Sequence, residues 1–210
     1  MFVVAPSGNW VRQLRRFVQP PSIARCELCG SVIADAHPHM VDTVGRHLLC
    51  VCPDCAATTE PGESRLRRLP PKVRRLENFN LTDAEWESLQ IPIGMAFMFH
   101  STPQGRVVAL YPGPAGATES LLPLAGWSDL VACNPALADL DPDVEALLID
   151  RIGERRDYYL VPIDRCYALV GLLRKHWRGL SGGTEAWQAI GEFFTRLRGS
   201  VGVIADWSHG

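Results

Sequence analysis

Residues 93–111 read IGMAFMFHSTPQGRVVALY. The first part, residues 93–99, is apolar on both alternating faces, which predicts a strand that is buried on both sides. Turn-forming residues follow in Thr102-Pro103-Gln104-Gly105, and residues 106–111 can form a second strand. The segment therefore predicts a β-hairpin, and we expect an antiparallel sheet at the centre of the protein.

The chain after this hairpin repeats the pattern of strands followed by helix. Residues 143–150 and 156–161 predict a second hairpin, with a turn around Gly153. Residues 163–177 and 184–198 then place apolar side chains at helical spacing, and we expect Thr184 to be the N-cap and Gly199 the C′ residue of the second helix. Two helices that cover one face of an antiparallel sheet give an α+β fold.

Shorter elements surround the first hairpin. Thr82 and Glu85 have the spacing of a capping box, which predicts a helix over residues 81–89. Residues 112–118 are rich in proline and glycine and predict a loop, and a further helix is expected near residues 124–132.

Two pairs of cysteines mark a separate region near the N-terminus, with CELCG at residues 26–30 and CPDC at residues 52–55. Each CxxC turn places two thiolates on one side of a knuckle, and two knuckles complete the four-sulfur site of a zinc ribbon. A segment of under about 40 residues buries too little apolar surface to fold alone, and metal binding contributes roughly 10–16 kcal/mol in zinc-finger peptides. We predict that a structural Zn²⁺ is bound by Cys26, Cys29, Cys52 and Cys55.

The choice of ligands is left open by four further residues of this region. Cys50 is expected to be a buried apolar thiol beneath the site, because free cysteine packs well in apolar surroundings. His39 is the best substitute ligand. His37 and His47 are expected to be solvated.

Two other kinds of site share parts of the cysteine pattern. A rubredoxin-type iron site also uses CxxCG and CPxC and would make the protein an electron carrier, but Ala56 replaces the glycine that normally follows the second knuckle. A His-Asn-His nuclease resembles the region as well, with His37 and His39 as its histidines, yet its usual histidine after the last cysteine and its asparagine are missing. Structural zinc is therefore favoured over iron and over a degenerate nuclease.

Composition limits the classes of function. The 210 residues are 47% hydrophobic and 21% charged, which excludes a disordered or fibrous chain. The formal net charge of −2 gives no general attraction for nucleic acid or acidic lipid. Basic residues are in excess in residues 1–75 and acidic ones in residues 76–210. The basic run of residues 65–75 lacks an aromatic side chain to stack on a base, so we expect no specific nucleic-acid partner.

The expected location is the cytoplasm. No apolar run reaches the roughly 18 residues of a transmembrane segment, and the arginines of residues 1–21 follow a short apolar stretch, whereas in a signal peptide they precede it. Most of the seven cysteines lie in the paired motifs, which in a reducing compartment indicates metal binding before disulfides.

The organisation along the chain follows from these elements. We expect five parts: an N-terminal arm with a short basic amphipathic helix over residues 1–22, a zinc-ribbon-like metal module over residues 23–60, a basic linker over residues 61–80, an α+β domain over residues 81–200, and a C-terminal tail over residues 201–210.

Four segments carry a resemblance when they are taken in order. They are RCELCG at 25–30, HLLCVCPDC at 47–55, IPIGMAFMFHSTPQGRVVALYPGPAGATESLL at 91–122 and VPIDRCYALVGLLRKHWRGLSGG at 161–183. Together they resemble an uncharacterised bacterial family whose genes accompany those of nickel-iron hydrogenases. The resemblance implies an accessory role in hydrogenase assembly or electron transfer, with a hydrogenase subunit or maturation factor as the partner. Because the residues suggest no set of nucleophile, base and oxyanion donors, we favour a non-catalytic interaction or assembly factor.

Overall fold

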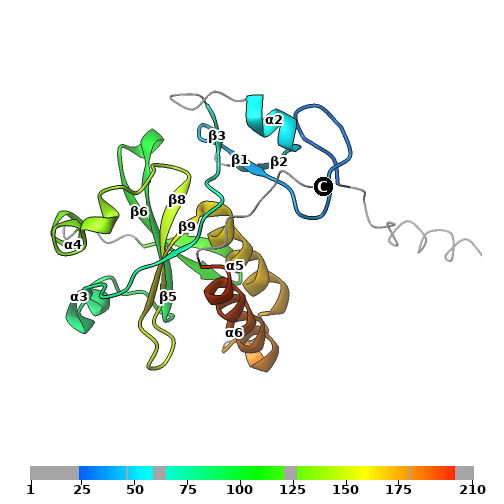
Figure 1. Ribbon diagram of the computed structural model, residues 1–210. Coiled ribbons are helices and arrows are strands. Elements are labelled where there is room, and N and C mark those ends of the chain that lie inside the picture. The colour runs from blue at the N-terminus through cyan, green and yellow to red at the C-terminus, as the bar shows by residue number, and fades with distance from the viewer. Residues whose placement is uncertain (1–23, 46, 59–64, 121–126, 180, 202–210) are drawn as a thin grey trace, which may run out of the picture.

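The computed structural model describes residues 24–45, 47–58, 65–120, 127–179 and 181–201. These residues form two antiparallel sheets with helices packed against them, which confirms the predicted α+β class (Figure 1). The amphipathic helix expected within residues 1–22 lies outside the described residues. Among the described residues, no helix is both long enough and apolar enough to cross a bilayer.

The larger sheet has six strands in the order β4-β9-β8-β5-β6-β7. Both predicted hairpins are present in it, and they pair through β5 and β8, with Phe97 opposite Leu148. The strands are β4 (Arg74–Arg75), β5 (Met95–Ser101), β6 (Arg106–Gly113), β7 (Gly116–Glu119), β8 (Glu145–Asp150) and β9 (Asp157–Pro162). The expected loop at residues 112–118 is wrong in part, because the turn there is short and β6 and β7 pair through Pro112 and Ala117.

Both faces of this sheet are covered, which explains why the middle residues of its central strands, such as Phe97 and Met98 of β5, are apolar on both faces. Phe97, Leu148 and Tyr159 point into one core, which is closed by the helices α5 (Ile163–His176) and α6 (Gly183–Gly199). The neighbouring residues Met98 and Leu147 point into a second core on the opposite face. Alternation along a strand sends successive side chains to opposite faces, so a strand between two cores has no polar side.

The helices over the first core follow the predicted amphipathic pattern, with a difference at the ends of α6. Its N-cap is Gly182, with a φ of 87°, and Thr184 lies inside the helix. Gly199 is the last helical residue and Ser200 is the C-cap. Glycine adopts the left-handed conformation of residue 182 without steric cost, so the helix begins earlier than the threonine signal predicts.

The second core is covered by α3 (Asp83–Ser88), α4 (Trp127–Cys133) and the 3₁₀ helix η2 (Pro135–Leu137). The predicted capping box of α3 is confirmed. The Thr82 side chain accepts from the Glu85 backbone N–H, and the Glu85 carboxylate accepts from the Thr82 N–H at 2.7 Å.

The smaller sheet has three strands in the order β2-β1-β3 and lies beside the start of α5 (Figure 1). Its strands are β1 (His39–Asp42), β2 (His47–Cys50) and β3 (Leu66–Arg68), and the helix α2 (Pro53–Thr58) follows β2. A separate core fills the space beneath it, with Met40 and Val51 fully buried. The three-stranded sheet, the two cysteine knuckles and α2 are called the metal module below.

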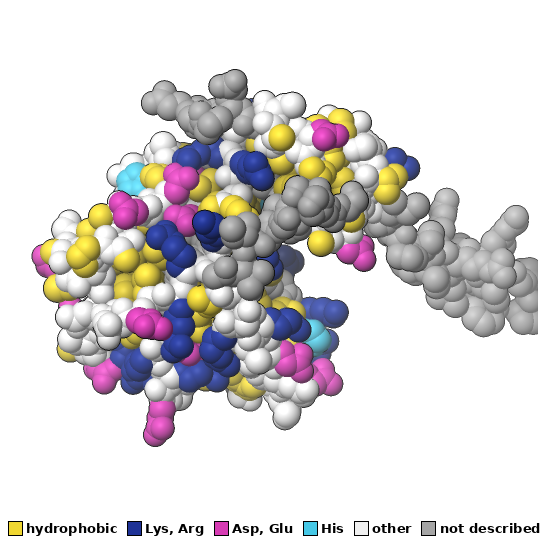
Figure 2. Space-filling view, viewed as in Figure 1, with side chains coloured by type: hydrophobic (Ala, Val, Ile, Leu, Met, Phe, Trp, Pro, Cys, Tyr) yellow, Lys and Arg dark blue, Asp and Glu magenta, His cyan; other side chains and the backbone are white. Residues whose placement is uncertain are grey.

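Residues 65–75 run between the two sheets and give a strand to each. Figure 2 shows that Lys and Arg side chains on the viewed face lie interspersed with Asp and Glu. Several arginines of this segment are in ion pairs, which join Arg65 to Asp42, Arg67 to Asp141, Arg74 to Glu145 and Arg75 to Asp157. The basic run is thus largely neutralised by acidic side chains of the protein itself.

Candidate metal centre

The first cysteine knuckle is a tight turn held by backbone hydrogen bonds. The Gly30 N–H donates to the Cys26 carbonyl at 2.8 Å, and the Cys26 N–H donates to the Ser31 carbonyl at 2.8 Å. Gly30 has a φ of 77°, a left-handed conformation that glycine adopts without steric cost. The turn therefore presents Cys26 and Cys29 on one side.

The second knuckle is built on the start of a helix. Cys52 lies two residues after the end of β2, and Pro53 begins α2, a position that suits proline because the first N–H groups of a helix have no partner. The Cys55 N–H lies 3.4 Å from the Cys52 sulfur, and the Ala56 N–H donates to the Cys52 carbonyl at 3.0 Å. The helix thereby fixes the direction of both thiols.

The two knuckles meet, and their four sulfur atoms all lie within 4.8 Å of one another. The sulfurs of Cys29 and Cys52 are 3.7 Å apart although the residues are separated by 23 positions. Cys26 and Cys52 are buried, Cys55 is half-buried and Cys29 is exposed. This four-cysteine cluster can hold a metal ion, as the sequence spacing predicts.

Proton affinities differ strongly within the cluster. Desolvation opposes ionisation of Cys26, but hydrogen bonds from the backbone of Cys52, Cys29 and Leu28 lower the pKa of its thiol to about 6. Hydrogen bonds with the thiols of Cys52 and Cys29 raise the pKa of Cys55 to about 12. Crowded sulfurs cannot all ionise by themselves, whereas a bound dication stabilises four thiolates at once.

The remaining residues of this region fall into a second group. Cys50 is half-buried at the edge of the module core, so the expectation of a buried thiol beneath the four-cysteine cluster is wrong. Its possible ligand atom lies within 4.8 Å of those of His37 and His39. His47 is exposed, as expected, whereas His37 is half-buried, so the expectation that it is solvated is wrong in part. The sequence signal for this grouping is the spacing of His37 and His39, because residues two apart on an extended chain share a face.

The two cysteines outside the module differ in their surroundings. Cys166 is fully buried in α5, and desolvation raises the pKa of its thiol well above the usual value. Cys133 is exposed on α4. Neither belongs to a described group of three or more metal-ligating side chains.

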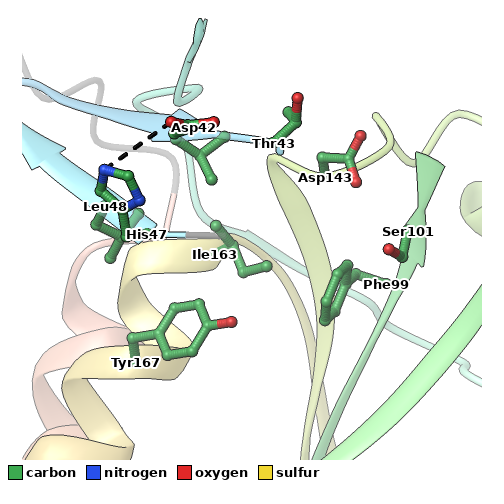
Figure 3. Close-up of a pocket in the computed structure, with 10 residues that line it drawn as sticks. Asp42, Thr43, His47, Leu48, Phe99, Ser101, Asp143, Ile163 and Tyr167 are labelled. Atoms are coloured by element: carbon green, nitrogen blue, oxygen red, sulfur yellow. Dashed lines mark ion pairs between the residues drawn. The ribbon is translucent and has the colours of Figure 1, made fainter. Parts of the chain in front are cut away.

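A narrow crevice lies where the metal module meets the larger sheet (Figure 3). Asp42 and His47 line it from the module, and Ser101, Asp143 and Tyr167 line it from the other side. Its volume of about 30 Å³ has room for about one or two water molecules. The crevice is thus too small for an organic cofactor.

Both parts of the protein lie within one known protein family. Residues 25–201 match a family of unknown function, DUF5947. The chain belongs to this family. No curated protein and no solved structure matches the chain. The family match covers both sheets and all four clustered cysteines, so the metal module and the larger sheet belong to one family unit.

Proposed function

We propose that Cys26, Cys29, Cys52 and Cys55 bind one structural Zn²⁺, and that the protein is a non-catalytic interaction or assembly factor. The observation that carries the proposal is the convergence of four sulfur atoms from two knuckles. Zinc in structural sites is four-coordinate and tetrahedral, and four thiolates are one of its common ligand sets.

The role assigned to the metal is structural because the protein supplies every ligand. A catalytic zinc site keeps a position for water or substrate, whereas four protein thiolates fill the tetrahedron. The ion joins the turn of residues 26–30 to the start of α2 and so closes the small core around Met40 and Val51. A core of this size depends on such a crosslink.

The partner we propose is a subunit or maturation factor of a nickel-iron hydrogenase. The sequence resemblance to a family encoded beside hydrogenase genes supports this assignment. The first knuckle offers a contact surface, because Leu28 and Val32 are 42% and 59% exposed on either side of Cys29. Apolar side chains held on a metal-fixed turn present a rigid surface that a partner can cover.

Elemental analysis of the purified protein tests the metal assignment. We expect about one zinc per chain in the four-cysteine cluster, and we expect Cys52→Ser to lose this zinc and to unfold the metal module. Cys133→Ser is the matched control, since Cys133 lies on α4 far along the chain from the module. A Cys52→Ser protein that keeps its fold and its zinc would contradict the proposal.

Affinity capture of nickel-iron hydrogenase from the native cells tests the partner. The wild-type protein should retain hydrogenase subunits, and Leu28→Glu together with Val32→Glu should reduce the amount retained at least tenfold with no loss of zinc. Val44→Glu is the control, because Val44 is 68% exposed at the turn between β1 and β2. Equal capture of hydrogenase by both variants would reject the knuckle surface.

A rubredoxin-like iron site is the second candidate function, in which the same thiolates hold iron and pass one electron to a hydrogenase. The exposed Cys29 favours it, since an accessible sulfur offers a short route for an electron. Ferric thiolate sites absorb visible light and zinc sites do not. Colourless protein from iron-replete cells would eliminate this function.

A degenerate His-Asn-His nuclease is the third candidate, and the order β1, β2, α2 with His39 on β1 favours it. Ala56, however, occupies the position where such nucleases carry a histidine, and it is 1% exposed. The nuclease function requires nicking of plasmid DNA that depends on His39 and on added divalent metal. Absence of nicking by metal-loaded protein would remove it.

A further inference from the structure

We propose that His37, His39 and Cys50 form a second metal site, distinct from the four-cysteine cluster, which binds a divalent ion of the Zn²⁺ type through two imidazoles and one thiolate. One possible ligand atom from each of the three residues lies within 4.8 Å of the other two. The inference does not rest on the proposed function, because none of the three belongs to the four-cysteine cluster.

Strand register brings the three side chains together. His39 on β1 pairs with Cys50 on β2, and directly paired residues of adjacent strands have side chains on the same side of the sheet. His37 lies two positions before His39 on the approach to β1, and their rings make an edge contact with centroids 4.8 Å apart. The hairpin therefore builds the group from its backbone geometry.

Hydrogen bonds leave the Nε2 atoms of both histidines available for a metal. The Nδ1 atom of His39 is 2.8 Å from a carboxylate oxygen of Asp164, and that of His37 is 2.8 Å from the Ala34 carbonyl. Carbonyl and carboxylate oxygens accept hydrogen bonds, so in each neutral ring Nδ1 carries the proton and Nε2 has a free lone pair. A metal ion binds this lone pair.

His37 also carries an unsatisfied atom at this place. Its Nε2 is buried and has no hydrogen-bond partner within the described part of the chain. A buried acceptor without a partner costs on the order of 1–3 kcal/mol, and native structures rarely tolerate it without a reason. A metal ion between His37, His39 and Cys50 provides the missing partner.

Asp164 supports His39 from another part of the fold. It lies in the first turn of α5 and reaches a histidine that is 125 positions earlier in the chain. A carboxylate bound to the second ring nitrogen orients a metal-ligating histidine and raises its basicity. The other side of the group is held by Glu27, whose carboxylate accepts from the Cys50 backbone N–H at 2.9 Å.

The ligand set indicates the kind of ion and its coordination. Imidazole nitrogen and thiolate sulfur suit zinc and similar transition metals, whereas magnesium and calcium take oxygen ligands. Three protein ligands leave one position of a tetrahedron to water, in contrast to the closed four-cysteine cluster. A bound ion would also fasten the metal module to α5 through the link from His39 to Asp164.

Zinc titration of the reduced, metal-stripped full chain tests the second site. The wild-type protein should bind about two equivalents of zinc, and the double variant His37→Ala, His39→Ala should bind about one. Cys50→Ser should show the same loss and guards against a folding defect of the double variant. The control is His47→Ala, which removes an exposed histidine from β2 and should keep both equivalents.

Asp164→Asn tests the positioning role separately, because it should change the affinity of the second site and not the number of ions bound. It should keep two equivalents but weaken the second one by about 10–100-fold, as is typical for partners of metal-binding histidines. An unchanged affinity would reject Asp164 as a positioning residue.

The two sites fail in different ways. A wild-type protein that binds only one equivalent, keeps it in His37→Ala, His39→Ala and in Cys50→Ser, and loses it in Cys52→Ser would overturn the second site and leave the four-cysteine site intact. A wild-type protein that binds only one equivalent, loses it in His37→Ala, His39→Ala and in Cys50→Ser, and keeps it in Cys52→Ser would overturn the four-cysteine site alone. Two equivalents in the double histidine variant would also overturn the second site.

Discussion

Arg67 of β3 donates a hydrogen bond to the Asp141 carboxylate at 2.7 Å and another to the Pro142 carbonyl at 3.0 Å. These bonds tie an outer strand of the metal module to the loop before β8. The Arg67 side chain is 24% exposed, so its guanidinium is partly withdrawn from water. Together with the bond between His39 and Asp164, this contact holds the module against the larger sheet.

Arg67→Ala should therefore destabilise the protein by about 1–2 kcal/mol in urea unfolding. This is more than an exposed ion pair contributes, because a charged hydrogen bond to a backbone carbonyl is lost as well. The exposed neighbour Arg68 provides the control, and Arg68→Ala should change the free energy of unfolding by less than about 0.5 kcal/mol. Equal effects of the two substitutions would show that the contact does not hold the module.

Asp42 predicts a loss of stability in acid. Hydrogen bonds from Arg65, and from the Gly45 and Val44 backbone, hold the pKa of its carboxyl well below the usual range. The pKa is depressed in the folded state, so the carboxylate stabilises the protein at any pH above about 3.9, the pKa of the carboxyl in the unfolded chain. This contribution is lost progressively as the pH falls below that value toward the lower pKa of the folded state. The Tm difference between the wild type and Asp42→Asn should thus be largest at neutral pH and shrink between pH 4 and pH 3. A difference that stays constant over this range would contradict the assignment.

Most of the fold could be predicted because its signals are local. Runs that are apolar at every position, such as residues 93–99, identified strands between two cores, and the capping box at Thr82 fixed the start of α3. The short strands β3, β4 and β7 carry no such signal. They form strands only by pairing with strands that are distant in the sequence, as Arg74 of β4 pairs with Leu160 of β9. The conformation of such short segments is determined by tertiary contacts and not by the local sequence.

The four-cysteine cluster could be predicted for a similar reason, since each CxxC turn is local and only their meeting is long-range. The second group could not be assembled from spacing alone. His37 and His39 share a face by alternation, but the partnership with Cys50 depends on the turn after Asp42, which sets the register of β1 and β2. Asp164 adds a contact across 125 positions that no local pattern reveals.

Phe194 should be among the most sensitive core positions. It is fully buried on α6, and its ring stacks with that of Tyr159 and makes an edge contact with that of Phe193. Phe194→Ala removes this burial and leaves a cavity, so a loss of about 3–5 kcal/mol is expected in the free energy of unfolding. Thr195→Ala, on the exposed face of the same helix, should stay within about 0.5 kcal/mol of the wild type. If Phe194→Ala lowers the free energy of unfolding by less than about 1 kcal/mol, the residue does not contribute to the core as the structure indicates.

The cap of α3 can be tested with two substitutions at one position. Thr82→Ala removes the side-chain oxygen that accepts from the Glu85 N–H at 3.2 Å, and it should cost about 1 kcal/mol of stability. Thr82→Ser keeps the oxygen and should change stability by only a few tenths of a kcal/mol. Chemical denaturation measures both, and equal stabilities for the two variants would mean that α3 does not contribute to the cooperative unit.

Two glycines should respond in opposite directions to the same change. A Cβ atom at Gly94 would lie 2.6 Å from the carbonyl oxygen of Arg151, a backbone atom held against β5, so Gly94→Ala should destabilise the protein by about 1–3 kcal/mol. Gly171 lies on the exposed face of α5 with nothing within 4 Å of its Cβ position. Alanine has a higher helix propensity than glycine, so Gly171→Ala should stabilise the protein by up to about 1 kcal/mol. Urea unfolding of both variants in parallel distinguishes steric crowding from helix propensity, because the same added methyl group should lower the free energy of unfolding at residue 94 and raise it at residue 171. A stabilised Gly94→Ala variant would show that the backbone of residues 94 and 151 is not packed as closely as the structure indicates.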